Sequence, residues 1–167
     1  MEYWYAVYTR PRHEKKVFEA LQEMGWESFL PMVTRVRLWK DRKKKVEMPL
    51  FSSYLFARFD YKHRFDLLHI SGVVKIVNFK GVPAVVPEWQ IDALKKMIEN
   101  PEKLQLEHYM RTGEQVEVIE GVFKGMRGAV KVVKGTTRLL VTIEGIQQTV
   151  SVELDSSFVK KIEQKSE

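Results

Sequence analysis

Residues 49–59 constrain the fold most, because Pro-Leu-Phe-Ser-Ser-Tyr-Leu-Phe-Ala-Arg-Phe places large apolar side chains at both alternating positions. In a strand, Phe51 and Leu55 lie on one side, whereas Tyr54 and Phe56 lie on the other. A strand with one face in solvent alternates apolar and polar residues, and this segment does not. The pattern therefore predicts either a strand covered on both faces or a strand whose second face docks another protein.

The composition is that of an ordinary globular protein. The 167 residues suffice for one medium domain, or for one medium and one small domain, and 44% are hydrophobic and 30% charged. No stretch approaches the roughly 18 uninterrupted apolar residues of a membrane span. The chain starts without the basic leader and apolar core of a secretory signal, so we expect a cytoplasmic protein that does not bind membranes. The absence of cysteine excludes disulfides, cysteine zinc sites and thiol catalysis.

The net charge of +6 belongs to the first part of the chain. Residues 1–100 hold 18 Lys+Arg and 12 Asp+Glu, whereas residues 101–167 hold 10 of each. A basic unit indicates a polyanionic partner, most simply a nucleic acid, although a solubilising charge bias explains the net charge equally well. Seven of the positive charges fall within eleven residues: Arg35, Arg37, Lys40, Arg42, Lys43, Lys44 and Lys45.

The first part of the chain alternates strands and helices. Hydrophobic periodicity predicts strands at 3–9, 27–30, 50–59 and 73–79. Helices are predicted at 13–24, 64–70 and 87–100. Residues 33–48 are predicted to be a mobile loop or a splayed hairpin. This order indicates an α+β fold in which helices cover an antiparallel sheet.

The second part of the chain has a different pattern. Residues 101–111 lack periodicity and are predicted to be a linker. Short alternating runs follow, separated by glycines, at 115–119, 129–133, 138–143 and 148–154. Short strands at this spacing are typical of a small β-barrel.

The order of these segments resembles the NusG family of transcription elongation factors. The resemblance begins at Trp4-Tyr5-Ala6-Val7-Tyr8-Thr9 and covers nearly the whole chain, with further matches at 49–51, 54–56, 72–74, 113–118, 120–128 and 152–154. It implies a NusG N-terminal domain over 1–100, a linker over 101–111 and an SH3-like KOW barrel over 112–167. Residues 10–16, 49–56 and 82–87 are more similar to the specialised paralogs, RfaH and the antiterminators of polysaccharide operons, than to housekeeping NusG.

The resemblance implies a transcription factor that is not an enzyme. Its N-terminal domain is expected to bind the clamp helices of the largest RNA polymerase subunit, to suppress pausing and to promote antitermination at specific operons. Such helices require a concave apolar surface with aromatic anchors. The family positions that line it match Tyr8, Phe51, Tyr54 and Phe56. Because one strand cannot present both faces to the clamp, we expect one or two of these four to be internal.

Two basic segments are candidates for nucleic-acid binding. The first resembles the family surface that faces the non-template DNA of the transcription bubble, with Arg10 as the best single candidate: Arg10, Arg12, His13, Lys15 and Lys16. The second suits upstream duplex DNA or nascent RNA: Arg35, Arg37, Trp39, Lys40, Arg42 and Lys43. A solvated helix face and a solvated hairpin without a partner are the alternatives.

The second domain is expected to recruit a KOW partner, such as Rho or a ribosomal protein, and we expect the chain to be a monomer. Val, Thr and Ile dominate residues 129–154, so we expect a constant β-barrel and not the α-helical hairpin that RfaH can form. The His-Thr-Thr-Thr contact of the specialised paralogs is replaced by residues 63–66, His-Arg-Phe-Asp. A second polymerase contact is therefore not carried over.

No catalytic, cofactor or metal site is predicted. The four histidines lack metal-ligand spacing with carboxylates, and no nucleotide-binding loop or nucleophile–base motif occurs. Two alternative functions stay open. One is a housekeeping NusG-like factor acting at most genes, and the other is a KOW-type RNA- or ribosome-associated protein without polymerase contact.

Overall fold

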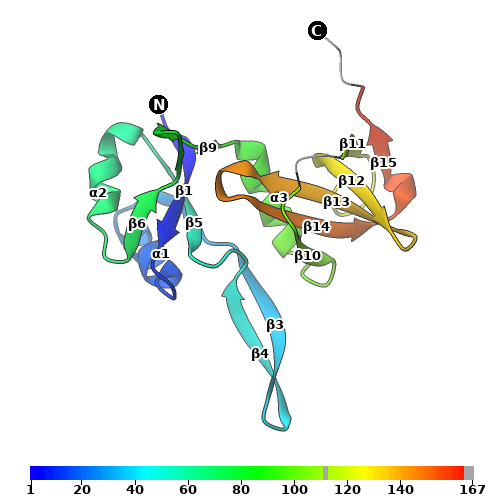
Figure 1. Ribbon diagram of the computed structural model, residues 1–167, viewed down its shortest axis with the longest axis horizontal. Helices are drawn as coiled ribbons and strands as arrows, with labels where there is room; N and C mark the ends of the chain where they lie inside the picture. Colours follow the sequence, from blue (N-terminus) through cyan, green and yellow to red (C-terminus); the bar gives the residue numbers. More distant parts are fainter. Residues whose placement is uncertain (111–112, 164–167) are drawn as a thin grey trace. The chain divides into compact units, whose positions relative to one another are not determined.

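The computed structural model describes residues 1–110 and 113–163. Residues 111–112 and 164–167, which belong to the expected linker and KOW domain, lie outside the described residues. The chain divides into two compact units, Met1–Glu88 and Trp89–Glu167 (Figure 1). The α+β fold class predicted from the sequence is confirmed, with helices on an antiparallel sheet followed by a small β unit.

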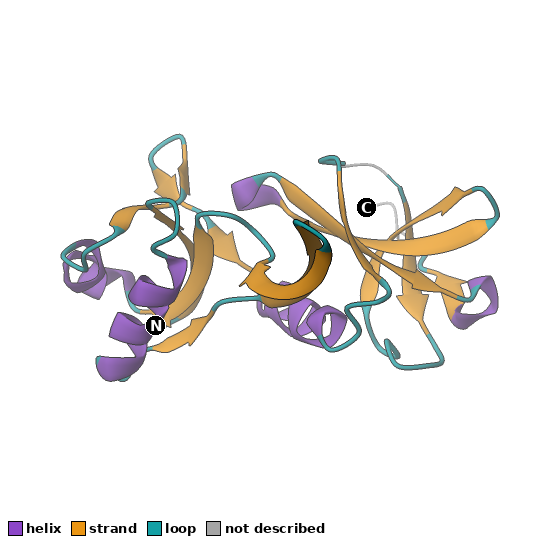
Figure 2. Cartoon of the chain, turned by 90° about the horizontal axis from the view of Figure 1, so that it is seen from below, coloured by secondary structure: helices purple, strands orange, loops and turns teal. Residues whose placement is uncertain are grey.

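The first unit is built on an antiparallel sheet of strand order β2-β5-β1-β6, with β9 also paired to β1. Its strands are β1 (Tyr3–Thr9), β2 (Glu27–Phe29), β5 (Tyr54–Phe59), β6 (Val73–Ile76) and β9 (Val85–Val86). Helices α1 (Glu14–Glu23) and α2 (Arg64–Leu68) gather on one side of it, and a short 3-10 helix, η1, spans Tyr61–His63 (Figure 2).

The core of the first unit lies between this sheet and the helices. Val17 and Leu21, one helical turn apart on α1, are fully buried together with Leu67 of α2. They pack against the residues of β1 and β5 that point to the helix side, among them Val7 and Leu55. One face of the sheet is thus occupied by the protein's own helices.

Two hairpins complete the first unit. The charged segment expected to be a loop or a splayed hairpin forms a regular two-stranded hairpin, β3 (Met32–Trp39) and β4 (Arg42–Pro49). It projects away from the main sheet (Figure 1). A smaller hairpin consists of β7 (Asn78–Phe79) and β8 (Val82–Pro83), so the single strand predicted over 73–79 is divided into β6 and β7.

In its described residues, the second unit consists of a six-stranded antiparallel sheet of order β10-β14-β13-β12-β11-β15 and one α-helix. The strands expected at 115–119, 129–133, 138–143 and 148–154 are confirmed. The elements are α3 (Glu88–Ile98), β10 (Leu104–Glu107), β11 (Glu114–Val118), β12 (Arg127–Val133), β13 (Thr136–Ile143), β14 (Gln148–Leu154) and β15 (Val159–Lys161), with the 3-10 helices η2 (Glu144–Ile146) and η3 (Ser156–Phe158).

The division between the units differs from the expected boundary at residue 100. All of α3 after Glu88 belongs to the second unit. There the Gln90 side chain donates to the Thr142 carbonyl at 3.1 Å, and Lys96 Nζ donates to the Lys124 carbonyl at 3.2 Å. Residues 104–107 of the expected linker form β10, which pairs with β14. Both α3 and β10 are therefore parts of the second unit.

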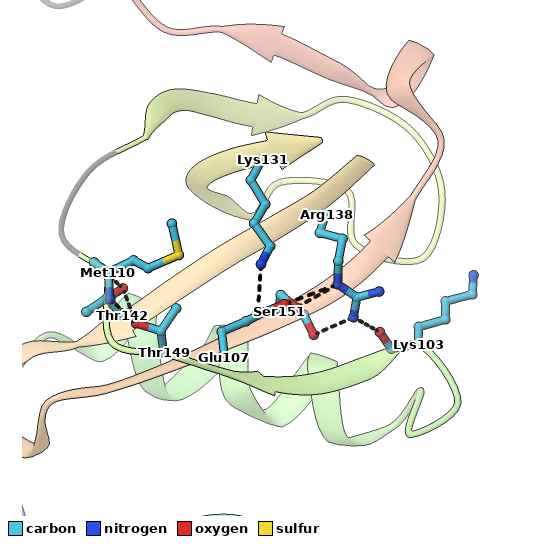
Figure 3. Close-up of polar contacts among 8 residues, drawn as sticks. All are labelled: Lys103, Glu107, Met110, Lys131, Arg138, Thr142, Thr149 and Ser151. Atoms are coloured by element: carbon cyan, nitrogen blue, oxygen red, sulfur yellow. Dashed lines mark hydrogen bonds and ion pairs between the residues drawn. The ribbon is translucent and has the colours of Figure 1, made fainter. Parts of the chain in front are cut away.

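A buried polar cluster holds β10 on the sheet (Figure 3). The Glu107 side chain is only 8% exposed, and it accepts hydrogen bonds from Lys131 Nζ and Ser151 Oγ, both at 2.6 Å. Arg138 Nε lies 3.5 Å from Glu107 Oε1, and Arg138 also donates to the Lys103 carbonyl at 2.9 Å. Burial raises the pKa of the Glu107 carboxyl, but the hydrogen bonds and these positive charges outweigh it, so the pKa is lowered.

Candidate functional site

The candidate site lies on the face of the first sheet that points away from α1 and α2. Across β1 and β5, Tyr8 is paired with Tyr54 and Ala6 with Phe56, and Phe29 of β2 is paired with Phe56 on the other side. Residues directly opposite each other on neighbouring strands share a face. Tyr8, Tyr54 and Phe56 therefore lie on the sheet face opposite the helices, where the two tyrosines are partly exposed and Phe56 is buried. This face is called here the aromatic surface.

The position of Phe51 corrects the sequence-based interpretation of residues 50–59 as one strand. Residues 50–53 form a turn, and β5 begins only at Tyr54. Ser53 has φ +69°, a left-handed conformation that reverses the direction of the chain. The Phe51 ring consequently meets the Phe56 ring edge-on, with centroids 6.3 Å apart, although simple alternation placed the two on opposite sides.

The four aromatic residues differ in exposure. Phe51 and Phe56 are 2% and 0% exposed, whereas Tyr8 and Tyr54 are partly exposed. The tyrosine rings lie 5.3 Å apart at 45°, and burial, followed by the nearby Tyr8, raises the pKa of Tyr54. Lys75 Nζ lies 5.9 Å from the Tyr8 ring centroid. This lysine was not singled out from the sequence, because only the pairing of β6 with β1 brings it beside Tyr8.

The first basic segment forms the turn between β1 and the beginning of α1. Arg10, Arg12, Lys15 and Lys16 are exposed and His13 is partly exposed. Arg12 adopts φ +64°, and the backbone N–H of Arg10 donates to the Gly72 carbonyl at 2.8 Å. The backbone of this turn is therefore fixed, while its positive side chains point into solvent.

A buried carboxylate connects this basic turn with the loop before β5. Glu14, the first residue of α1, is 7% exposed and accepts a hydrogen bond from the Ser53 backbone N–H at 2.8 Å. The Ser53 carbonyl in turn accepts from the backbone N–H of Thr9 at 2.8 Å. The loop that carries Phe51 is thus held against the residues that begin the basic turn.

The second basic segment is carried by the β3–β4 hairpin, which is a separate two-stranded sheet. All six residues predicted from the sequence, Arg35, Arg37, Trp39, Lys40, Arg42 and Lys43, are exposed. The cross-strand register places Arg37 opposite Lys44 and Leu38 opposite Lys43, so Lys43 lies on the other face from Arg37. The hairpin therefore does not present all six side chains on one surface.

Two further classes of site concern residues 1–110 and 113–163, namely metal centres and membrane-spanning helices. No group of three or more His, Asp or Glu side chains there is arranged to hold a metal ion. No helix in this part of the chain is long and apolar enough to cross a membrane.

Comparison with known proteins identifies the class to which this architecture belongs. The family model described as "Transcription termination factor nusG" matches residues 2–95, more than half of the chain. The chain therefore belongs to the NusG family of transcription termination and antitermination factors.

One relative and one solved structure were matched over nearly the whole chain. The transcription termination/antitermination protein NusG of Pseudomonas aeruginosa is 25% identical over 175 residues, which covers 95% of this chain and 98% of the relative. The solved structure titled "Domain interaction in Thermotoga maritima NusG" covers 98% of each chain with a TM-score of 0.51 and 23% identity. The structural likeness supports the fold, and the family is assigned from the sequence match.

Proposed function

We propose that this protein is a transcription elongation factor that binds the clamp helices of RNA polymerase through its aromatic surface. The observation that carries the proposal is the meeting of Tyr8, Tyr54, Phe56 and Phe51 on the sheet face that α1 and α2 leave uncovered. Tyrosines supply rigid apolar contact area together with a polar hydroxyl, and such residues dominate the binding energy of many interfaces. The two buried phenylalanines hold β5 and the loop before it, which place Tyr54 beside Tyr8 of β1.

The basic turn would place positive charge beside this surface. Through Glu14 and Ser53 the turn and the loop before β5 form one connected piece of backbone. A protein held on polymerase by the aromatic surface would therefore present Arg10 and Arg12 in a fixed direction, which suits contact with the non-template DNA strand. The second unit is proposed to recruit a further partner, such as Rho or a ribosomal protein.

Replacing Tyr54 with alanine is expected to weaken binding to an isolated clamp-helix fragment of polymerase by about tenfold or more, because an aromatic anchor is lost. Tyr3→Ala is the matched control, since Tyr3 is an exposed tyrosine of the same sheet but is paired with Phe59 on the helix side. Calorimetric titration of both variants measures the effect. Wild-type affinity in a folded Tyr54→Ala protein would contradict the proposed site.

We further propose that the protein acts at specific operons, because residues 10–16, 49–56 and 82–87 resemble the specialised antiterminators. In transcription with purified polymerase, read-through is expected to increase on the native leader and not on a scrambled leader. Equal effects on both would favour a housekeeping factor. No effect on either, together with no binding to polymerase, would favour an RNA- or ribosome-associated protein.

A further inference from the structure

The two faces of the β3–β4 hairpin carry different side chains. Directly opposed residues share a face, and successive residues of a strand alternate between faces. In the register of this hairpin, one face, called here the arginine face, carries Arg35, Arg37, Trp39, Arg42 and Lys44 beyond Val33 and Met48. The opposite face, called the lysine face, carries Thr34, Val36, Leu38, Lys43, Lys45 and Glu47.

Positive charge is therefore concentrated on one side of the hairpin. The arginine face holds four basic side chains and no acidic one, whereas the lysine face holds two basic side chains and Glu47. Arg37 and Lys44 stand directly opposite each other, an arrangement of like charges that destabilises a strand pair. Within residues 1–110 and 113–163, no carboxylate forms an ion pair with any of the four basic residues of the arginine face. A polyanion lying on this face would relieve that repulsion.

Trp39 indicates which kind of polyanion this face would bind. Its side chain is 68% exposed at the end of β3, on the same face as its cross-strand partner Arg42. An exposed indole among arginines is suited to stacking on a nucleic-acid base, with phosphates held on either side. A basic two-stranded ribbon also fits the major groove of a duplex. Bases in a duplex, however, are stacked on one another and leave no face for Trp39, so the indole favours unpaired bases.

We propose that the arginine face of the hairpin binds single-stranded nucleic acid, with Trp39 stacked on a base and Arg35, Arg37, Arg42 and Lys44 along the phosphates. The eight-residue strand β3 reaches about 26 Å, long enough for a strand of several nucleotides to lie along it. This inference rests on the proposed function, because a transcription complex contains the single-stranded nucleic acid that the hairpin would bind. It also divides the basic segment, since Lys43 and Lys45 lie on the lysine face.

The hairpin offers matched variants for the test, because equal changes can be made on its two faces. Arg35→Gln with Arg37→Gln and Lys43→Gln with Lys45→Gln each remove two positive charges, from opposite faces. Trp39→Ala and Leu38→Ala each truncate an exposed apolar side chain, and Trp39→Phe keeps an aromatic ring. Affinities of the full chain would be measured by fluorescence anisotropy at several salt concentrations. The probes are oligothymidylate and oligouridylate of about 12 nucleotides, and a DNA duplex of the same length.

On the single-stranded probes, Trp39→Ala is expected to weaken binding about tenfold. The double variant Arg35→Gln with Arg37→Gln, called here the arginine pair, should weaken binding at least tenfold and reduce its dependence on salt. Trp39→Phe should retain most of the affinity. Leu38→Ala and the double variant Lys43→Gln with Lys45→Gln should each lower the affinity by less than about threefold. A preference between the thymidylate and uridylate probes would distinguish the DNA strand from RNA. Equal losses from both faces, or tighter binding of the duplex than of either single strand, would overturn the proposal.

The test of the hairpin can fail independently of the test of polymerase binding. Binding to the isolated clamp-helix fragment involves no nucleic acid, so the arginine pair should bind that fragment with wild-type affinity. Failure of Tyr54→Ala to weaken fragment binding would contradict the polymerase site alone. Failure of the arginine face to discriminate between probes would contradict the single-strand site alone.

Discussion

Replacing Gly128 with alanine is expected to unfold the sheet of the second unit. Gly128 lies on β12, paired with Val116 of β11, and a Cβ atom on it would overlap the carbonyl oxygen of Leu140 and crowd Leu139 Cδ1 at 3.3 Å. The carbonyl belongs to the backbone of β13, so no change of side-chain rotamer relieves the overlap. The strands would have to separate, and we expect the free energy of unfolding to fall by more than about 4 kcal/mol.

Gly135→Ala is the control for this prediction. Gly135 has φ +78° in the turn between β12 and β13, and nothing lies within 4 Å of its Cβ position. Its replacement should therefore cost only the backbone strain, about 1–2 kcal/mol. Urea denaturation, with hydrogen-exchange protection of the β12–β13 amides, measures both variants. The steric explanation would be wrong if Gly128→Ala kept wild-type protection or was less damaging than Gly135→Ala.

The sequence predicted the elements of the first unit well but not the turn that assembles the candidate site. Helical periodicity located α1, because Val17 and Leu21 recur one turn apart, and the run of aromatic and β-branched residues at 3–9 located β1. Alternation failed at residues 50–53, where the left-handed backbone of Ser53 and the buried carboxylate of Glu14 replace a strand by a turn. Neither residue has a local signal for this role. The hydrogen bond joins positions 39 residues apart, and only the fold brings them together.

In the second unit, too, the sequence predicted the main strands but not an element that depends on distant contacts. The four main strands were predicted from their alternation, whereas β10 (Leu104–Glu107) was interpreted as linker because residues 101–111 lack a clear periodicity. Its pairing depends on contacts with distant residues, above all those of Glu107 with Lys131 and Ser151. The division of side chains between the two faces of the β3–β4 hairpin could not be predicted either. It follows from the register of the strands, which the sequence of a charged segment does not specify.

Replacing Glu107 with alanine is expected to lower the free energy of unfolding by about 3 kcal/mol, because it removes the carboxylate that pairs with two largely buried positive charges. The side chains of Lys131 and Arg138 are 23% and 12% exposed. Glu114→Ala is the matched control on the same sheet, since Glu114 forms an ion pair with Lys161 at 3.0 Å in which the two side chains are 52% and 77% exposed. An exposed pair of this kind contributes no more than about 1 kcal/mol, so urea denaturation should separate the two variants.

The lowered pKa of Glu107 makes its contribution depend on pH in a defined direction. The carboxyl takes up its proton at lower pH in the folded protein than in the unfolded chain, whose ordinary value is 4.5. Its stabilising effect is therefore complete above that value and is lost as the pH falls through the folded pKa. The difference in free energy of unfolding between the wild type and Glu107→Gln should accordingly be constant near neutral pH and shrink in acid, as urea titrations from about pH 7 to about pH 3 would measure. Glutamine keeps the size and an acceptor oxygen of the side chain, so a difference that did not change with pH would mean that packing, and not the charge of Glu107, holds β10 on the sheet.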